Sequence, residues 1–560
     1  MGEPTGAPGD EGFHALDALG RDFWAWRAVH QPFTGDDIPR IDRPAEWAPD
    51  WSPASIAAQR AALAAFERRW RALDPSDWPI PRQVDYRLVG SALARGRWEL
   101  EILRTWQRNP LFYLDQTLGA VFDRLLQPPP FDRTRGEEIV RRLESIPRTL
   151  QDARANLVGH AVAPFARLAL ERLAEAPTRL RAALRALAPY LPSESAARLG
   201  PAGEAASEAL EGFRAWLAEQ LPTLVDGTAI GRDAYAFFLT HVALMPFTPE
   251  QLLARGRQEW ERAVAFEAYE QQRNAGLPPL ALLLDQEAEM RREAEDELAV
   301  RRFCEARDLL TFPAWLRHYR FRPLPPYLEP LAFLGVTDDL TSPTRLDQDG
   351  TSYIAPPSPT LGYFALANAR DPRTGIAHEG MHYFQLALSW AHENPLRRHY
   401  YDSGANEGIG FYAEEMLLQA GLFDDSPRTR EIIYSFMRLR ALRVEVDVRL
   451  ALGSFDLDEA ARELATMVPM DWETAHHEAV FFASSPGQAM TYQIGKLQLL
   501  KFLADARLAQ GDGFRLRAFH DFVWKNGNVP IALQRWEWLG LRDEIDTLDR
   551  LASGGSERHA

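Results

Sequence analysis

A short segment near the middle of the chain has the side-chain types and spacing of a zinc site. Residues 377–385 read Ala-His-Glu-Gly-Met-His-Tyr-Phe-Gln and contain the pattern His-Glu-x-x-His. On an α-helix, His378 and His382 lie four positions apart, so both imidazoles leave the same face. This separation allows two ring nitrogens to reach one zinc ion at about 2.0–2.1 Å. Glu379 is placed to bind the water on the metal and act as general base.

A zinc ion held by two histidines needs at least one more protein ligand and an open position for water. Glu407 is the expected third ligand, because it lies 407 − 382 = 25 positions after the second histidine, at the start of the next predicted helix. A turn containing Ser403 and Gly404 would bring that helix back beside the first one. Glu414 lies on the same helix face as Glu407.

The histidine pair has an alternative interpretation as buried side chains that satisfy backbone groups. Gly380 argues against it, since glycine inside a helix costs about 1 kcal/mol relative to alanine, and close approach of a substrate or a backbone would explain it. Glu379 would also be costly to bury in this apolar helix without a metal or a partner. We therefore expect zinc as cofactor, with His378, His382 and Glu407 as its ligands.

Two residues outside the motif are expected to assist catalysis. Tyr492 shares a helix face with Gln488 and Gly495, and its hydroxyl could donate to the oxyanion that forms when water adds to a carbonyl. The alternative for Tyr492 is a core tyrosine. Arg443 is expected to stabilise the same oxyanion or a substrate carboxylate.

The remaining histidines carry weaker signals. His476 and His477 have no third group at metal spacing and are expected to be a solvated or interface pair. His520 is expected to be structural, and His241, His392 and His399 receive no role. No phosphate-binding loop, Gly-x-Ser-x-Gly elbow or dinucleotide fingerprint occurs.

Composition restricts the class of protein. The chain has 560 residues, of which 46% are hydrophobic and 25% charged, as in ordinary globular proteins. Its net charge of −16 argues against nucleic acid or an anionic membrane as partner. One cysteine, Cys304, excludes an intrachain disulfide and a cysteine-based metal site. Without an apolar run of about 20 residues or a signal-like N-terminus, we expect a soluble cytoplasmic protein.

Apolar periodicity predicts a mainly α-helical fold with a small β-sheet near the active site. Residues 321–360 are rich in proline and read as loops and short strands, and Leu361–Leu366 is the best strand candidate. We divide the chain into a disordered N-terminus (1–12), a helical region forming cleft walls (13–320), a catalytic region (321–552) and a disordered tail (553–560). The helices predicted most clearly are 249–274, 285–307, 406–421, 428–452, 457–467, 472–482 and 487–508.

Several segments follow one order that resembles a known family. They are Gly231-Arg232-Asp233-Ala234-Tyr235, His378-Glu379-Gly380, Asn406-Glu407-Gly408, Pro486-Gly487-Gln488-Ala489 and Phe519-His520-Asp521. Over roughly residues 20–545 the chain resembles the bacterial domain-of-unknown-function family 885, whose members are similar to zincin metallopeptidases. The spacing from His382 to Glu407 also resembles that of thimet oligopeptidase-like enzymes, in which the corresponding glutamate binds zinc.

The sequence departs from the family pattern at two places. Family members commonly carry Pro-Gly between His-Glu and the second ligand histidine, whereas His382 here completes a plain His-Glu-x-x-His. Arg443 and Asp447 keep their spacing, but Leu450 and Ala451 stand where a histidine is expected. The substrate preference is therefore expected to differ from that of typical members.

These observations predict a zinc-dependent hydrolase of peptide or peptide-like amide bonds that acts on short peptides. The alternatives are a zincin-like scaffold that binds a peptide or small ligand without catalysis, and a carboxypeptidase resembling the Taq type. The segment Gly362–Leu366 is expected to pair with the substrate backbone as an added strand. Oligomeric state is not predicted.

Overall fold

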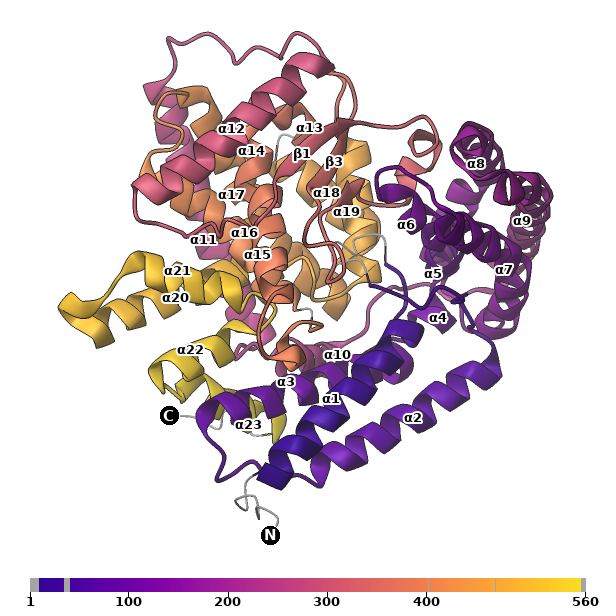
Figure 1. Ribbon diagram of the computed structural model, residues 1–560, viewed down its shortest axis with the longest axis horizontal. Coiled ribbons are helices and arrows are strands. Elements are labelled where there is room, and N and C mark those ends of the chain that lie inside the picture. The colour runs from indigo at the N-terminus through magenta and orange to yellow at the C-terminus, as the bar shows by residue number, and fades with distance from the viewer. Residues whose placement is uncertain (1–9, 35–40, 401, 469, 555–560) are drawn as a thin grey trace, which may run out of the picture.

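The computed structural model describes residues 10–34, 41–400, 402–468 and 470–554. Helices make up most of it, as the sequence predicts. The N-terminal helices form two groups, one along the bottom and one on the right of the molecule (Figure 1). The first group is α1 (Asp10–His30), α2 (Pro53–Arg71) and α3 (Ile80–Arg97), and the second is α7 (Arg133–Leu157), α8 (Ala163–Leu187) and α9 (Ser193–Gln220). Short helices join the groups: Trp98–Leu103, α4 (Thr105–Arg108), α5 (Leu111–Leu114), Asp115–Gly119 and α6 (Ala120–Leu126).

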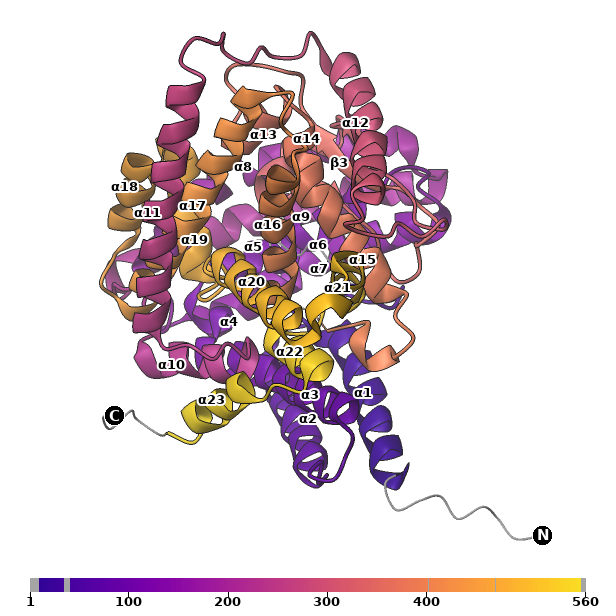
Figure 2. The same cartoon turned by 90° about the vertical axis from the view of Figure 1, so that its left-hand side faces the viewer.

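The rest of the chain forms a helical body around a central helix, α16 (Ser403–Ala420), as Figure 2 shows. Long helices α11 (Pro249–Arg273) and α17 (Pro427–Leu452) run side by side, and α20 (Thr491–Gln510) packs against α16. The other helices are α10 (Arg232–Phe237), α12 (Gln286–Ala306), α13 (Tyr363–Asn368), α14 (Arg373–Gly375), α15 (Met381–Trp390), α18 (Leu457–Met467), α19 (Trp472–Ser484), α21 (Leu516–Lys525), α22 (Ile531–Leu539) and α23 (Asp543–Ala552).

Three short strands form the sheet, in the order β1-β3-β2. Strand β1 (Tyr319–Pro323) is parallel to β3 (Gly350–Ile354), and β2 (Asp338–Asp339) is antiparallel to β3. Helix α12 packs against β1, where the Phe321 backbone N–H donates to the Glu293 carboxylate at 3.1 Å. A mainly α fold with a small sheet is therefore confirmed.

The predicted strand at Leu361–Leu366 is wrong, because this segment begins helix α13. Gly362 has extended backbone angles and precedes the first helical residue, and the following Ala and Leu residues favour a helix. Tyr363 and Phe364 then turn onto α17, with ring centroids 5.5 and 5.2 Å from that of Phe436. The aromatic pair that resembles a strand is thus a helix-to-helix contact.

Local signals predicted several helix ends correctly. Thr248 and Gln251 form a reciprocal cap at the start of α11, with N···O distances of 2.9 and 3.3 Å. Asp285 caps α12 by accepting from the Ala288 N–H at 2.8 Å. Helix α18 has the predicted bounds.

Helices that precede residue 320 pack against elements that follow it. Helix α11 lies before it and packs along α17, while α12 packs on β1. One hydrophobic core contains residues from Leu16 to Leu548. Of the predicted disordered ends, residues 1–9 and 555–560 lie outside the described part of the chain, and α1 already begins at Asp10. No described helix has both the length and the apolar composition needed to cross a membrane.

Candidate metal centre

The two histidines of the motif lie where a π-helical turn meets an α-helix. His378 belongs to the π-helical turn Ile376–Gly380, and His382 to α15 directly after it. Their Nε2 atoms are 3.2 Å apart, and their rings are nearly perpendicular. Isolated π-helical turns occur frequently at functional sites. The sequence predicts a shared face for this pair but not the widened turn.

Glu407 completes the group from the next helix. Its Oε2 lies 3.1 Å from His382 Nε2 and 3.4 Å from His378 Nε2. Ligands at about 2.0–2.1 Å in a tetrahedral zinc site stand about 3.3 Å from one another. The three measured separations therefore fit the corners of such a site, and all three side chains are buried.

Gly410 provides the space for both imidazoles. A Cβ at this position would lie 2.7 Å from His382 Nε2 and 3.0 Å from His378 Cε1. Gly410 follows Glu407 by three positions on α16, so the helix that supplies the third ligand also leaves room for the other two.

A second set of side chains orients His378 through its other ring nitrogen, Nδ1. The Glu414 carboxylate, on α16, lies 2.7 Å from His378 Nδ1. Arg440, on α17, pairs with the same carboxylate at 2.9 Å. A carboxylate on the far nitrogen of a metal-binding histidine fixes the tautomer and the ring orientation. Glu414 therefore acts through His378, whereas Glu407 faces the ligand position.

The pKa values of this group reflect its close packing. Burial and the Arg440 guanidinium act to lower the pKa of His378, but the Glu407 and Glu414 carboxylates outweigh them and raise it to about 9. Burial alone would raise the pKa of Glu407, yet His382 and His378 hold it well below its usual range. Without a metal the group is therefore an ion pair, and a cation bound there would replace the proton.

Glu379 lines the cavity in front of the two histidines. Its Oε2 is buried and has no hydrogen-bond partner among the described residues. The adjacent Gly380 packs closely, since a Cβ there would lie 3.3 Å from Ile376 Cγ2 and 3.5 Å from a ring carbon of Tyr319. The tighter of these two contacts is with Ile376 in the same helical turn, whereas the tyrosine of β1 lies at ordinary contact distance.

Tyr492 and Arg443 lie beside the histidines, in the arrangement of a stack. The Tyr492 ring is nearly parallel to that of His378, with centroids 6.0 Å apart. The Arg443 guanidinium lies over the same tyrosine, 4.8 Å from its centroid. Both Arg443 hydrogen bonds go to the Glu478 carboxylate, at 2.7 and 2.8 Å. Arg443 therefore lies beside Tyr492 with its charge already paired to Glu478.

Glycines fix the distance between the Glu407 helix and the Tyr492 helix. Helix α16 meets α20 at Gly408 and Gly495, where a Cβ on Gly408 would lie 2.8 Å from the Gly495 Cα. A Cβ on Gly495 would lie 2.8 Å from the Gly408 Cα, so the element that approaches Gly495 is α16. Backbone contact here leaves the two helices little freedom to slide.

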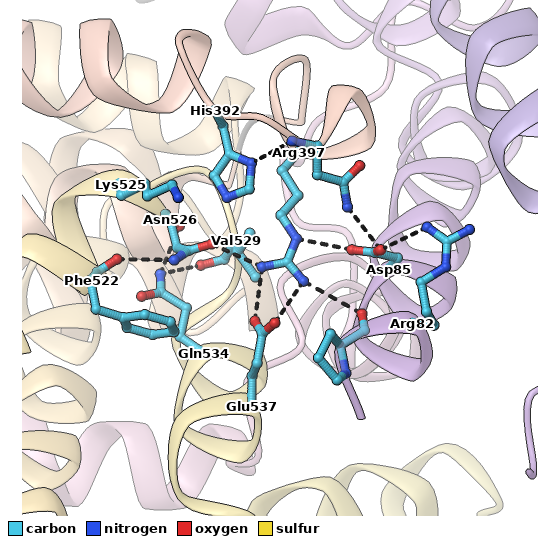
Figure 3. Close-up of polar contacts among 12 residues, drawn as sticks. Arg82, Asp85, His392, Arg397, Phe522, Lys525, Asn526, Val529, Gln534 and Glu537 are labelled. Atoms are coloured by element: carbon cyan, nitrogen blue, oxygen red, sulfur yellow. Dashed lines mark hydrogen bonds and ion pairs between the residues drawn. The ribbon is translucent and has the colours of Figure 1, made fainter. Parts of the chain in front are cut away.

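The segment between α15 and α16 is anchored by a buried arginine, Arg397 (Figure 3). Its guanidinium donates to Asp85 of α3 at 2.9 Å and to both oxygens of Glu537 of α22 at 2.8 and 3.0 Å. A further bond goes to the Asn526 side-chain oxygen at 2.9 Å. Helices from both ends of the chain thus hold the connection that returns α16 beside α15.

One cavity of about 1700 Å³ opens onto the site. Its walls come from the N-terminal helices α1, α3 and α8 as well as from α16, α17, α19 and α20. Glu379, Glu407 and Tyr492 lie on its surface, together with many aromatic side chains. The cavity is large enough for several amino-acid residues of an extended chain.

The other histidines lie outside the metal centre. His520 is buried between the Tyr412 hydroxyl and the Leu309 carbonyl, at 2.7 Å from each, and burial lowers its pKa to about 4. This supports its structural assignment. His476 and His477 line the cavity, while their neighbour Glu478 is the partner of Arg443.

Sequence reasoning missed Arg440 and the role of Glu414. Arg440 precedes Arg443 by three positions, so helical spacing alone places both on one face. The spacing of the two arginines is visible in the sequence, but only the packing of α17 against α16 shows that Arg440 reaches the Glu414 carboxylate. Among the described residues, His378, His382 and Glu407 are the group whose donor atoms converge as a metal site.

Comparison with known proteins identifies a family and a fold. A model of the bacterial protein family of unknown function DUF885 matches residues 35–536. A candidate lipoprotein of unknown function from Shewanella oneidensis has a similar structure, with a TM-score of 0.72 and 16% identity over 94% of this chain and 99% of its own. A candidate lipoprotein from Colwellia psychrerythraea gives a TM-score of 0.73 and 16% identity, covering 96% of this chain and 99% of its own.

No curated protein matches the chain. At 16% identity the two solved structures share the fold alone. Because both are described as candidate lipoproteins, they give no support to the predicted cytoplasmic location.

Proposed function

We propose that this chain, which belongs to the bacterial family of unknown function DUF885, is a zinc-dependent hydrolase of peptide or peptide-like amide bonds. The observation that carries the proposal is the separation of His378 Nε2, His382 Nε2 and Glu407 Oε2 by 3.1 to 3.4 Å. These distances fit a tetrahedral zinc ion with one open position. A zincin-like arrangement is the corresponding interpretation of the fold, supported by the motif helix, the returning ligand helix and the nearby sheet.

The metal would be held by His378, His382 and Glu407, and it would supply a Lewis acid that lowers the pKa of a bound water toward about 7. Glu379 takes a proton from the attacking water and gives it to the leaving amine. Its buried oxygen without a protein partner suits this task, because the carboxylate is not already committed to a structural bond.

Tyr492 stabilises the substrate oxygen as negative charge develops, by donating its hydroxyl. Arg443 positions that tyrosine, since its guanidinium lies against the ring while both of its hydrogen bonds go to Glu478. This changes the role predicted from sequence, in which Arg443 bound the oxyanion or a substrate carboxylate itself. The predicted strand pairing with Gly362–Leu366 falls away, because that segment is helical.

Short peptides remain the expected substrates. The cavity is bounded by helices on several sides, and an unfolded chain of a few residues fits this space better than a folded protein. We also propose that neither nucleic acid nor a membrane surface is a partner, because the net charge is −16.

The test compares three variants on a peptide library with metal analysis. Glu379→Gln should retain one zinc per chain and lose about 10²- to 10⁴-fold in turnover, since only the proton transfer is removed. Glu407→Ala should lose the zinc itself. Glu473→Gln, which changes an exposed carboxylate on the rim of the same cavity, serves as the control and should keep activity.

The proposal fails if wild-type protein loaded with zinc cleaves no peptide of the library. It also fails if Glu379→Gln cleaves as fast as the control. Zinc binding with peptide binding but no cleavage would instead establish the non-catalytic scaffold.

A further inference from the structure

The arginines that line the cavity differ in whether their charge is balanced within the protein. Arg27, Arg82, Arg179, Arg440 and Arg443 each form an ion pair with a carboxylate, at 2.6 to 2.9 Å. Arg95 forms neither an ion pair nor a hydrogen bond with any described residue, although it lines the same cavity. Its Nε is buried, so this guanidinium is held in the wall rather than extended into bulk solvent.

The position of Arg95 is fixed by its own helix. Arg95 lies one turn after Ser91 on α3, and the Ser91 hydroxyl is hydrogen-bonded to the Tyr400 hydroxyl. Tyr400 also donates to the Val242 carbonyl at 3.2 Å. Residues four apart share a helix face, so these bonds hold the Arg95 face of α3 against the residues that lead into α16.

Arg95 therefore lies near the N-terminal end of α16, the helix that carries Glu407. Ser403, the first residue of α16, lines the cavity, and Glu407 follows it by one turn on the same face. Four residues of helix rise about 6 Å, which sets the distance along α16 between this end and the metal ligand. Arg95 interacts electrostatically with Asp402, which caps α16 by accepting from the Ala405 N–H at 3.1 Å.

We propose that Arg95 binds the free C-terminal carboxylate of the peptide substrate, so that the enzyme removes one or two residues from the C-terminus. The inference rests on the proposed hydrolase function and specifies its substrate. A guanidinium matches a carboxylate in a two-pronged geometry. One residue of extended chain spans about 3.3–3.6 Å, so a carboxylate at Arg95 places a peptide carbonyl one or two residues away near the metal ligands.

Two other cavity arginines lack an ion pair among the described residues, and their positions suit this role less well. Arg21 is exposed on α1. Arg172 lies on α8 beside His477 of α19, away from the α16 end that carries Ser403 and Glu407. Arg172 is therefore the matched control, since it is a cavity arginine of similar partial burial.

The experiment uses pairs of identical pentapeptides that end in a free carboxylate or in a carboxamide. Zinc-loaded wild-type protein should cleave the acids about 10- to 100-fold faster in kcat/KM than the amides, because hydrogen bonds to charged groups contribute about 1.5–3 kcal/mol. Arg95→Gln should lose this preference by a rise in KM for the acids, with cleavage of the amides unchanged. Arg172→Gln should retain the full preference.

Several results would overturn the proposal. Equal cleavage of acids and amides by wild type excludes a carboxylate subsite, and loss of the preference in Arg172→Gln places it on α8 instead. A preference that survives in Arg95→Gln, with only a lower unfolding midpoint, identifies Arg95 as a structural partner of Asp402.

Binding to the zinc-loaded Glu379→Gln variant separates this proposal from the hydrolase assignment. Isothermal titration with the same pentapeptides should show tighter binding of the acid than the amide, and adding Arg95→Gln should abolish the difference. If wild type cleaves nothing but this binding pattern holds, the catalytic assignment fails and the carboxylate subsite stands. If the acid and the amide bind equally, the subsite is refuted whether or not cleavage occurs.

Discussion

Two buried clusters of this protein combine arginine, histidine and carboxylates, yet they differ in how completely they are satisfied. Around Arg397, the guanidinium reaches Asp85, Glu537 and Asn526 through hydrogen bonds of 2.8 to 3.0 Å (Figure 3). Around His378, Glu379 Oε2 and His382 Nδ1 have no hydrogen-bond partner among the described residues. The Arg397 guanidinium and its three partners are thus hydrogen-bonded to one another, whereas the second cluster leaves buried polar atoms unpaired among the described residues and so has capacity for a ligand.

This difference separates stability from function. A hydrogen-bonded network buried between α3, residues 391–400 and α22 fixes the relative positions of those elements. An unsatisfied group at the same depth costs free energy unless a ligand relieves it. Substitutions in the Arg397 cluster should therefore change unfolding, and substitutions around His378 should change metal affinity.

Arg397→Ala should produce the largest effect on stability. Removing the guanidinium takes the ion-pair partner from Glu537 and leaves Asp85 with only Arg82 and Asn394, and breaking a buried pair costs about 3–5 kcal/mol. The measurement is the free energy of unfolding in denaturant. Arg87→Ala is the matched control, because Arg87 pairs with Asp549 at a partly exposed site and should cost at most about 1 kcal/mol. Equal losses in both variants would contradict the comparison.

Glu414→Gln should produce the next largest effect, and it should appear in zinc affinity. This substitution removes the carboxylate that orients His378 but keeps the ligand Glu407. Loss of a group that holds a metal ligand in place costs about 10- to 100-fold in metal affinity. Competition with a chelator measures this. The neighbouring Glu415 pairs with Lys496 at 2.7 Å instead of with a histidine, so Glu415→Gln should leave zinc affinity unchanged. Unchanged affinity in Glu414→Gln would remove its assigned role.

His392 should make a contribution to stability that depends on pH. Its Nδ1 accepts from the Asn394 N–H at 2.9 Å, while burial and the charges of Arg397 and Lys525 lower its pKa from 6.5 to about 4. The folded state therefore keeps the ring neutral, so its contribution is complete above pH 6.5 and is lost as the pH falls toward 4. By linkage, the shift from 6.5 to about 4 corresponds to a loss of at most about 3 kcal/mol.

The check is the free energy of unfolding of His392→Asn minus that of wild type, measured across pH 4 to 8. An asparagine oxygen can accept the same backbone hydrogen bond but does not titrate. The difference should therefore rise in favour of the variant as the pH falls from 6.5 to 4, because only wild type loses stability, and a difference independent of pH would contradict the assignment.

The metal ligands could be predicted from sequence because each depends on a short pattern. His378, Glu379 and His382 are local, and Glu407 needed only the length of one helix and one turn. The helix ends at Thr248 and Asp285 were predictable for the same reason, since a cap is a contact between neighbours in sequence.

What the sequence did not reveal depends on contacts between distant segments. Arg440 acquires its role because α17 packs beside α16, and Arg397 because α3 and α22 meet the same loop. The segment Leu361–Leu366 leads into a helix instead of forming a strand, because Tyr363 and Phe364 pack on Phe436 of α17. Periodicity describes one element at a time and does not specify its neighbours.

The contact between Gly408 and Gly495 has a consequence for altering this protein. Because α16 and α20 touch through backbone, the zinc ligand on one and the tyrosine on the other behave as a single rigid part. Directed evolution toward new substrates should therefore leave α16 and α20 unchanged. Substitutions should accumulate instead in α1, α8 and α19, whose side chains also line the cavity.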